Sequence, residues 1–408
     1  MIARNSSLKH FASSHFRWTL FFLSLAACGD FKAAPDAFKS SKETSGPFSY
    51  SHVSQFDPEN PEVKEESLDH YSVRIEFPEQ LNKNLHVRRI DKTTDEARDF
   101  EHPEVVKVDG ANTVFISDMI DLRGEKKTVR EFEYIVYSDD VEISRKKISI
   151  KPTVFVKGTR TLEEVGLDAG EYTIDRFYFA EGAHLVTNGK SITLRVDKLV
   201  ANAGVVETFT EQDALKPAPD ETMGRSGGMI KIIATEGKGS LSFYMRGGKG
   251  GTGSKGDDST GVGDRGADSR PDIPPNNNPF IRFPCMPLGG PATNGGTGPK
   301  GGTGRPGSPG GSSGFVDFRV MTESDPVISV SIAAIPGEPG NGGPGGKGGA
   351  GGPPGNGGTF SCVHGTYPAA APGGEGPQGD TGSKGSLGVK DRSCVVIAPK
   401  TFCQGLDN

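Results

Sequence analysis

The sequence has little tryptophan, few cysteines and an excess of acidic over basic residues. Its single tryptophan is Trp18, so the rest of the chain lacks the indole rings common in carbohydrate-binding sites. No CxxC pair occurs and the histidines form no pair at ligand spacing, so we expect no metal site. With 46 Lys and Arg against 52 Asp and Glu, the net charge is -6, and we expect no nucleic-acid partner. The phosphate-binding pattern GxGxxG occurs only in glycine-rich segments and never between a strand and a helix, so we expect no cofactor.

Glycine is abundant, with 58 residues, and much of it is spaced regularly. Eight glycines stand three apart in residues 337–358, and the same spacing recurs in 247–256, 295–310 and 373–388. A period of three fits neither an amphipathic helix nor a half-buried strand. It is the repeat of polyproline II, which rises about 3.1 Å per residue and has no internal hydrogen bonds. The sequence therefore predicts four rods whose peptide groups pair with neighbouring rods or with water.

The phase of the glycines predicts how the rods pack. Residues 337–358 contain extra glycines in a second common phase, so two of three faces lack side chains, as a rod packed between two others requires. Residues 295–310 and 373–388 mostly have one bare face, which predicts rods at the edge of a bundle. We favour a monomeric bundle folded from one chain. A homotrimeric collagen-like stalk, in which three chains share a glycine-lined axis, and a disordered glycine-rich segment are the alternatives.

The N-terminus has the features of an export signal. Basic residues precede an apolar stretch at residues 18–25, which is shorter than the roughly 20 residues that span a bilayer. The ending Leu25-Ala26-Ala27-Cys28 resembles the lipobox of bacterial lipoproteins. The resemblance implies that residues 1–27 are removed and that Cys28 carries diacylglycerol and fatty acids such as palmitate. An ordinary secretory signal is the alternative.

The same resemblance implies a location in the bacterial cell envelope. Gly29 follows the cysteine, where an inner-membrane retention signal has aspartate, so we expect a surface-exposed lipoprotein of the outer membrane. Without residues 1–27, which contain three basic and no acidic residues, 43 Lys and Arg stand against 52 Asp and Glu, a net charge of -9.

Four cysteines remain after Cys28, an even number that favours disulfides in an exported chain. Cys394 and Cys403 flank a strand followed by a turn, which predicts a hairpin bridge. Cys285 and Cys362 would then pair and tie the loops at the rod ends. Three connectivities are possible from the sequence.

The rest of the chain predicts an all-β protein. A tether at 28–47 precedes short alternating strands at 48–152, which resemble an immunoglobulin-like or fibronectin-III-like sandwich. Residues 153–246 carry β-branched and aromatic strands separated by glycines, which resemble the rungs of a β-solenoid. A polyglycine/polyproline-II rod bundle with interleaved strands follows at 247–388, and a disulfide hairpin at 389–408. The rods resemble the adhesin tips of certain phage tail fibres and, more distantly, glycine-rich antifreeze proteins.

These features favour a surface lipoprotein with a structural or adhesive role, binding a surface protein or a glycan. Phe280 and Phe283 lie in a loop between two rods, where exposed aromatic side chains form a candidate contact site; packing over a rod end is the alternative. We expect no catalytic residues. The alternative function is a carbohydrate-active enzyme on the solenoid, with candidate carboxylates at Glu171, Asp175, Glu181 and Asp197. A cluster of aspartates at 257–268 is interpreted as solvated and not as a calcium site.

Overall fold

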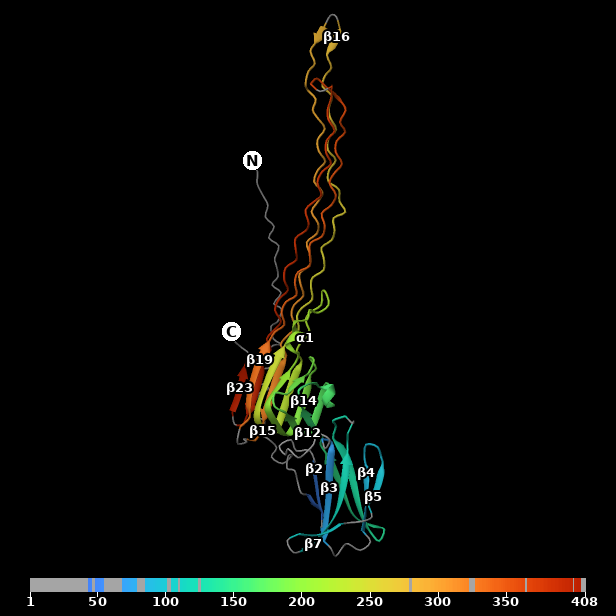
Figure 1. Cartoon of the computed structure of the whole chain (residues 1–408), viewed down its shortest axis with the longest axis vertical. Coiled ribbons are helices and arrows are strands. Elements are labelled where there is room, and N and C mark those ends of the chain that lie inside the picture. Colours follow the sequence, from blue (N-terminus) through green and yellow to red (C-terminus); the bar gives the residue numbers. More distant parts are fainter. Residues whose placement is uncertain are drawn as a thin grey trace, which may run out of the picture. The chain divides into compact units, whose positions relative to one another are not determined.

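The computed structural model describes residues 43–45, 48–54, 68–78, 85–100, 104–108, 111–123, 126–278, 281–322, 327–363, 365–398 and 400–404. Strands dominate these residues, with one short helix, α1 (Glu211–Leu215), and one 3-10 turn (Glu163–Val165) among them (Figure 1). The predicted all-β class is confirmed. No helix in the described ranges is both long and apolar enough to cross a membrane.

The N-terminal part consists of two antiparallel sheets that share one hydrophobic core. The five-stranded sheet has the order β1 (Glu43–Ser45), β2 (Phe48–Ser54), β3 (His70–Pro78), β7 (Ala111–Asp121) and β6 (Glu104–Val108). The four-stranded sheet has the order β5 (Ala97–Phe100), β4 (Leu85–Asp91), β8 (Arg130–Ser138) and β9 (Val141–Ile150). The alternation in β3 explains the packing, because Val73 and Ile75 face Val87 of β4 and Val136 of β8 in one cluster while the polar residues between them face outward.

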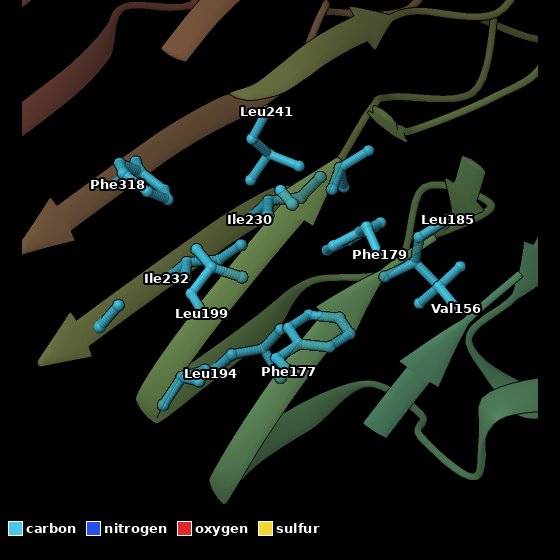
Figure 2. Close-up of a cluster of buried hydrophobic side chains, with 14 of the residues drawn as sticks. Val156, Phe177, Phe179, Leu185, Leu194, Leu199, Ile230, Ile232, Leu241 and Phe318 are labelled. Carbon is cyan, nitrogen blue, oxygen red and sulfur yellow. The ribbon is translucent and has the colours of Figure 1, made fainter. Parts of the chain in front are cut away.

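The middle and C-terminal strands form one large sheet in which parallel strands are stacked in two rows. The first row is β10 (Thr153–Val156), β12 (Gly170–Phe179), β14 (Ile192–Glu207), β15 (Met229–Arg246), β18 (Phe315–Val320) and β22 (Ser393–Ile397). The second row is β11 (Thr159–Thr161), β13 (His184–Val186), the later parts of β14 and β15, and β19 (Ser329–Ile335). Apolar residues from both rows fill a common core, including Leu194, Phe318 and Leu185 (Figure 2).

The long strands β14 and β15 change row at a bend. The pairing of β14 with β15 shifts register between Ala201 and Gly204. At the matching place in β15, Gly239 has a φ of 94°, and a Cβ there would come within 3.0 Å of the Ala201 carbonyl oxygen. Glycine is therefore required at this bend for both backbone conformation and space.

The predicted rods leave this sheet and return to it. Rod 1 (residues 247–272) continues β15, and rod 2 (293–313) leads into β18. Rod 3 (336–358) continues β19, and rod 4 (371–391) leads into β22. Because β15 and β19 are parallel neighbours, rods 1 and 3 start as parallel neighbours: Gly247 N donates to Ile335 O at 2.9 Å. Rods 2 and 4 are related in the same way through β18 and β22, and Ser313 N donates to Val389 O.

Hydrogen bonds between the rods recur at every third residue, as expected for a backbone with three residues per turn. Rod 3 donates to rod 2, for example from Gly343 N to Arg305 O at 2.8 Å, and it accepts from rods 1 and 4. Rod 2 donates to rod 4, from Gly301 N to Pro377 O at 3.1 Å, and also to rod 1. Rods 2 and 3 are therefore the inner pair, and rods 1 and 4 lie outside them.

The glycine phases of rod 3 have the predicted role. A Cβ on Gly346 would come within 3.0 Å of the Asp257 carbonyl oxygen of rod 1, and one on Gly348 equally close to the Gly376 carbonyl oxygen of rod 4. Two faces of rod 3 thus lie directly against neighbouring backbones. Rod 4 has one such face, which contacts rod 2, as expected of an edge rod.

The prediction that residues 295–310 form an edge rod was wrong, because rod 2 bonds to three neighbours. The reason lies in where Cβ atoms point. A Cβ on Gly301 would collide with the backbone of rod 3, whereas one on Gly302 would find its nearest atom, Asp257 N, at 3.0 Å. The second phase of rod 2 bonds to rod 1 through its N–H groups yet has room for the side chains of Arg305 and Ser308.

The regular pairing of rods 1 and 2 is interrupted at one place. Gly296 and Gly302, six residues apart in rod 2, donate to Asp264 and Asp257, which are seven residues apart in rod 1. Rod 1 therefore holds one extra residue in this stretch. Pro299 lies midway between the two donors on rod 2, and it has no N–H to donate.

Candidate functional site: the tip of the rod bundle

Rods 1 and 3 run in parallel, so the two turns that follow them lie at the same end of the bundle. We call residues 269–292 and 358–371 the tip, which includes the last residues of rods 1 and 3 and the first of rod 4. Its described part contains two small hairpins, β16 (Asn276–Asn278) with β17 (Ile281–Phe283), and β20 (Phe360–Ser361) with β21 (Gly365–Thr366). In Figure 1, β16 lies beyond the ends of the rods. The rod 1 to rod 3 hydrogen bonds continue into the tip, where Asp272 N donates to Phe360 O at 3.0 Å.

A disulfide joins the two turns of the tip. It connects Cys285 and Cys362, whose Cα atoms are 5.9 Å apart, across a sequence separation of 77 residues. This is the pairing expected from the sequence. It makes the two turns, which come from different excursions of the chain, one cross-linked unit.

The carboxylate of Asp272 organises the same unit from within. Asp272 is 2% exposed, and its oxygens accept hydrogen bonds from Gly289 N, Cys362 N and Tyr367 Oη, each at 2.8 Å. These donors come from both turns. The hydrogen bond from Cys362 N is the largest influence and, with those from Tyr367 and Gly289, holds the pKa of Asp272 below its usual value, although burial opposes it.

The lowered pKa of Asp272 predicts that the tip loses stability in acid. Because the folded-state pKa of Asp272 is lowered, its contribution to stability is present above the unfolded-state pKa of about 3.9 and is lost as the pH falls through the folded-state value. We expect the amide chemical shifts of Gly289 and Cys362 to be constant from neutral pH down to about pH 5 and to change together below about pH 4. In Asp272→Asn the two shifts should not titrate together. A transition of these amides near neutral pH in the wild type would contradict the assignment.

Exposed apolar side chains gather at the tip. They are Ile273 (47% exposed), Met286 (37%), Leu288 (71%), Phe360 (41%) and Val363 (75%), and we call them the apolar tip cluster. Ile273 and Met286 exchange two backbone hydrogen bonds of 3.1 Å, and Leu288 N donates to Met286 O. Phe360 pairs with Asp272, and Val363 follows the disulfide-bonded Cys362. The backbone interactions therefore bring the five residues together.

Of the two aromatic residues predicted to form a contact loop, Phe283 lies in a described strand. Phe283 ends β17, and its backbone pairs with Asn276, while its side chain and the whole of Phe280 lie outside the described structure. Their role as contact residues stays a prediction. The apolar tip cluster could not be predicted from the sequence, because a single apolar residue carries no sequence signal of its exposure.

Cys394 and Cys403, the other two cysteines predicted to form a disulfide, lie outside the tip. Cys394, in β22, is disulfide-bonded, and the residue opposite it in the antiparallel pairing with β23 (Lys400–Gln404) is Cys403. The predicted terminal hairpin is therefore also the last part of the large sheet, since β22 pairs with β18 in parallel. Cys28 lies outside the described residues.

The carboxylates considered for catalysis are mostly paired with cations. Glu171 accepts a hydrogen bond of 2.6 Å from Arg195 Nε, and Asp197 accepts one of 2.7 Å from Lys151 Nζ. Burial raises the pKa of Asp175, against the influence of Arg176. Glu181 lies on the surface.

The acidic residues of rod 1 have similar local partners. Asp258 pairs with Lys255 and accepts from Lys347 N, and Asp268 pairs with Arg265. Among the described residues, no group of three or more His, Cys, Asp or Glu side chains could hold a metal ion. Comparisons with protein-family models, with curated proteins and with solved structures found no match to this chain.

Proposed function

We propose that the protein is a membrane-anchored surface lipoprotein with a structural or adhesive role, in which the tip makes the contact. The observation that carries the proposal is the construction of the tip. Four rods from one chain end in a small unit that a disulfide and a buried carboxylate hold together and that exposes five large apolar side chains. Exposed apolar patches on a soluble part of a protein are typical of contact sites.

The N-terminal sequence supports the anchor. A lipid on Cys28 would fix the chain to a membrane, since several acyl chains together bind a bilayer stably. The outer membrane is the proposed location, with residues 28–47 as a tether. The two-sheet part would serve as an immunoglobulin-like or fibronectin-III-like spacer. The large parallel sheet would serve as a β-solenoid from which the rods extend, in an arrangement similar to phage tail-fibre adhesin tips.

Substitution of Cys28 is expected to release the protein from the membrane. In Cys28→Ala the acceptor of the lipid is lost, so the protein should move from the membrane fraction to the soluble fraction of the envelope. Cys394→Ala, which also removes a cysteine, should stay with the membrane. Fractionation followed by mass spectrometry of the N-terminal peptide measures both. Retention of Cys28→Ala at the wild-type level would rule out the lipid anchor.

Adhesion itself is tested on whole cells. Cells that display the wild-type protein should adhere to a target surface, and cells that display Leu288→Asp/Val363→Asp should not, at equal amounts of surface protein. Equal adhesion by both strains would contradict an adhesive role for the tip.

A further inference from the structure

The described part of the chain contains one buried lysine. Lys127, which lies between β7 and β8, is 8% exposed, and its Nζ donates a hydrogen bond to Asp69 Oδ1. Lysine is among the residues least often buried in proteins. The Lys127 side chain passes over Gly166, since a Cβ there would lie 3.0 Å from Lys127 Cγ. Gly166 stands between Val165 and Leu167, which are themselves buried, so the stem of this lysine runs along an apolar segment.

The carboxyl of Asp69 lacks the additional donors that usually stabilise a buried charge. Its side chain is 15% exposed, and among the described residues Lys127 Nζ is the only hydrogen-bond donor to it. The buried Asp118 of the same two-sheet part differs, because it accepts from Arg89 Nη1 at 2.9 Å and also from Tyr134 Oη at 2.7 Å. An ion pair removed from water needs such extra donors to offset the loss of hydration. The Lys127–Asp69 pair is therefore poorly compensated as a pair of charges.

The uncharged form of this pair is chemically reactive. Burial is the largest influence on Asp69 and raises its pKa, although the hydrogen bond and the charge of Lys127 oppose it. A proton on the carboxyl instead of the amine removes both charges from the buried site. In that form an amine with a free lone pair is in contact with a carboxylic acid, and these two groups are the reactants of amide formation.

We propose that Lys127 and Asp69 form an intramolecular amide bond between Nζ and Cγ. The lone pair of Nζ attacks Cγ, and two protons of the original ammonium leave with one carboxyl oxygen as water, so no oxidant or other reactant is needed. Groups held in contact reach effective concentrations on the order of 10⁵–10⁸ M. His70 and Asp121, whose side chains are 3.4 Å apart, both interact electrostatically with the Asp69 carboxyl and are the groups placed to carry the protons.

The bond would join the two sheets of the N-terminal part. Asp69 immediately precedes β3 of the five-stranded sheet, and Lys127 shortly precedes β8 of the four-stranded sheet. The residues between them, with a sequence separation of 58, would form a closed loop. In a protein held by a lipid on Cys28 and loaded at the tip, a pulling force would pass through the bond and bypass strands β3 to β7. This mechanical role rests on the proposed function, whereas the bond itself does not.

Peptide mapping of the full-length protein tests the bond. After denaturation, reduction and digestion of the wild type, mass spectrometry should find one branched peptide that contains both Asp69 and Lys127. Its mass should be that of the two separate peptides less one water molecule. In Lys127→Arg the positive charge opposite Asp69 is kept, but a guanidinium does not form this amide, so the two peptides should be separate. Recovery of the wild-type residues only in separate linear peptides would overturn the proposal.

A second lysine–carboxylate contact in the same molecule provides the matched control. Lys92 Nζ lies 2.6 Å from Glu133 Oε2, whose side chain is 5% exposed. The Lys92 side chain, however, is 36% exposed, and Arg145 also pairs with Glu133, so water and a second cation stabilise the charges. The same digest should contain no peptide that links Lys92 to Glu133. Equal yields of both links would assign them to sample preparation and would also overturn the proposal.

Single-molecule stretching of the full-length protein tests the mechanical role. Unfolding of the two-sheet part should lengthen the wild type by roughly 200 Å less than Lys127→Arg, because the residues across a separation of 58 stay closed at about 3.3–3.6 Å each. Equal lengthening in the two proteins would contradict a closed loop. If the branched peptide is found while Cys28→Ala stays on the membrane, the bond is correct and the anchored function is wrong. If the branched peptide is absent while Cys28→Ala is released, only the bond is wrong.

Discussion

Replacing Gly346 or Gly348 with alanine is expected to destabilise the rod bundle. At a position with room for a methyl group, the same substitution would stabilise a folded protein. Alanine restricts the unfolded chain and by this effect alone adds about 0.4–1 kcal/mol. In rod 3, however, the added methyl group would meet a carbonyl oxygen of rod 1 or rod 4 within 3.0 Å. Overpacking of this kind costs about 1–3 kcal/mol. The sign of the change in unfolding free energy therefore reports the packing.

Lys347 provides the control in the same triplet. It lies on the exposed third face of rod 3, so Lys347→Ala should change the free energy of unfolding by no more than about 0.5 kcal/mol. Thermal melts and hydrogen exchange of the rod amides measure all three variants, and light scattering gives the molar mass. A lower free energy of unfolding in both glycine variants, with the molar mass of a monomer, agrees with the single-chain bundle. Damage from only one of them in a trimer would instead indicate a collagen-like stalk, in which one glycine phase lines the axis.

Removing the tip disulfide should have a comparable or larger effect. The bridge closes a loop with a sequence separation of 77 residues, for which the chain-entropy model gives a stabilisation of about 4.5 kcal/mol. We expect Cys285→Ser/Cys362→Ser to lower the free energy of unfolding of the bundle by up to that amount.

The position of this loss can be measured as well as its size. Hydrogen exchange should increase most at the backbone amides of positions 362 and 289, which bond to Asp272 in the wild type, and least in the core strands β12 and β14. Arg270→Gln is a suitable control within the tip, because it leaves the bridge intact. A loss below about 1 kcal/mol would show that the rods alone fix the tip.

The sequence predicted the rods well because glycine spacing has few explanations. Two glycine phases in residues 337–358 identified an inner rod, and the structure places backbones against both. The same reasoning failed for rod 2. Glycine spacing indicates the positions where a Cβ would collide with a neighbour, but it does not indicate which neighbour accepts the hydrogen bond of each N–H group. Arg305 and Ser308 donate to rod 1 through their backbone N–H groups although both carry side chains in that phase of rod 2.

The candidate site was harder to predict than the rods. Cys285 and Cys362 could be paired by elimination. Phe280 and Phe283 were conspicuous as aromatic residues in a largely polar segment. The five residues of the apolar tip cluster were not conspicuous, since each is a single apolar residue between prolines, glycines, cysteines or polar residues. Their grouping depends on Asp272, which looks in the sequence like any surface aspartate and proves to be buried.

The extra residue in rod 1 has a consequence for folding. Chains with a three-residue repeat could slip past one another by one triplet and recover almost the same contacts, so regular rods alone would leave several nearly equivalent alignments. Pro299 lacks an N–H, and its place on rod 2 coincides with the stretch where rod 1 has one residue too many. After a slip of one triplet, the proline would stand against a carbonyl that needs a donor, and a rod 2 N–H would stand against the irregular stretch. A position outside the repeat thus adds to the register of the sheet in selecting one alignment, in which Cys285 and Cys362 meet.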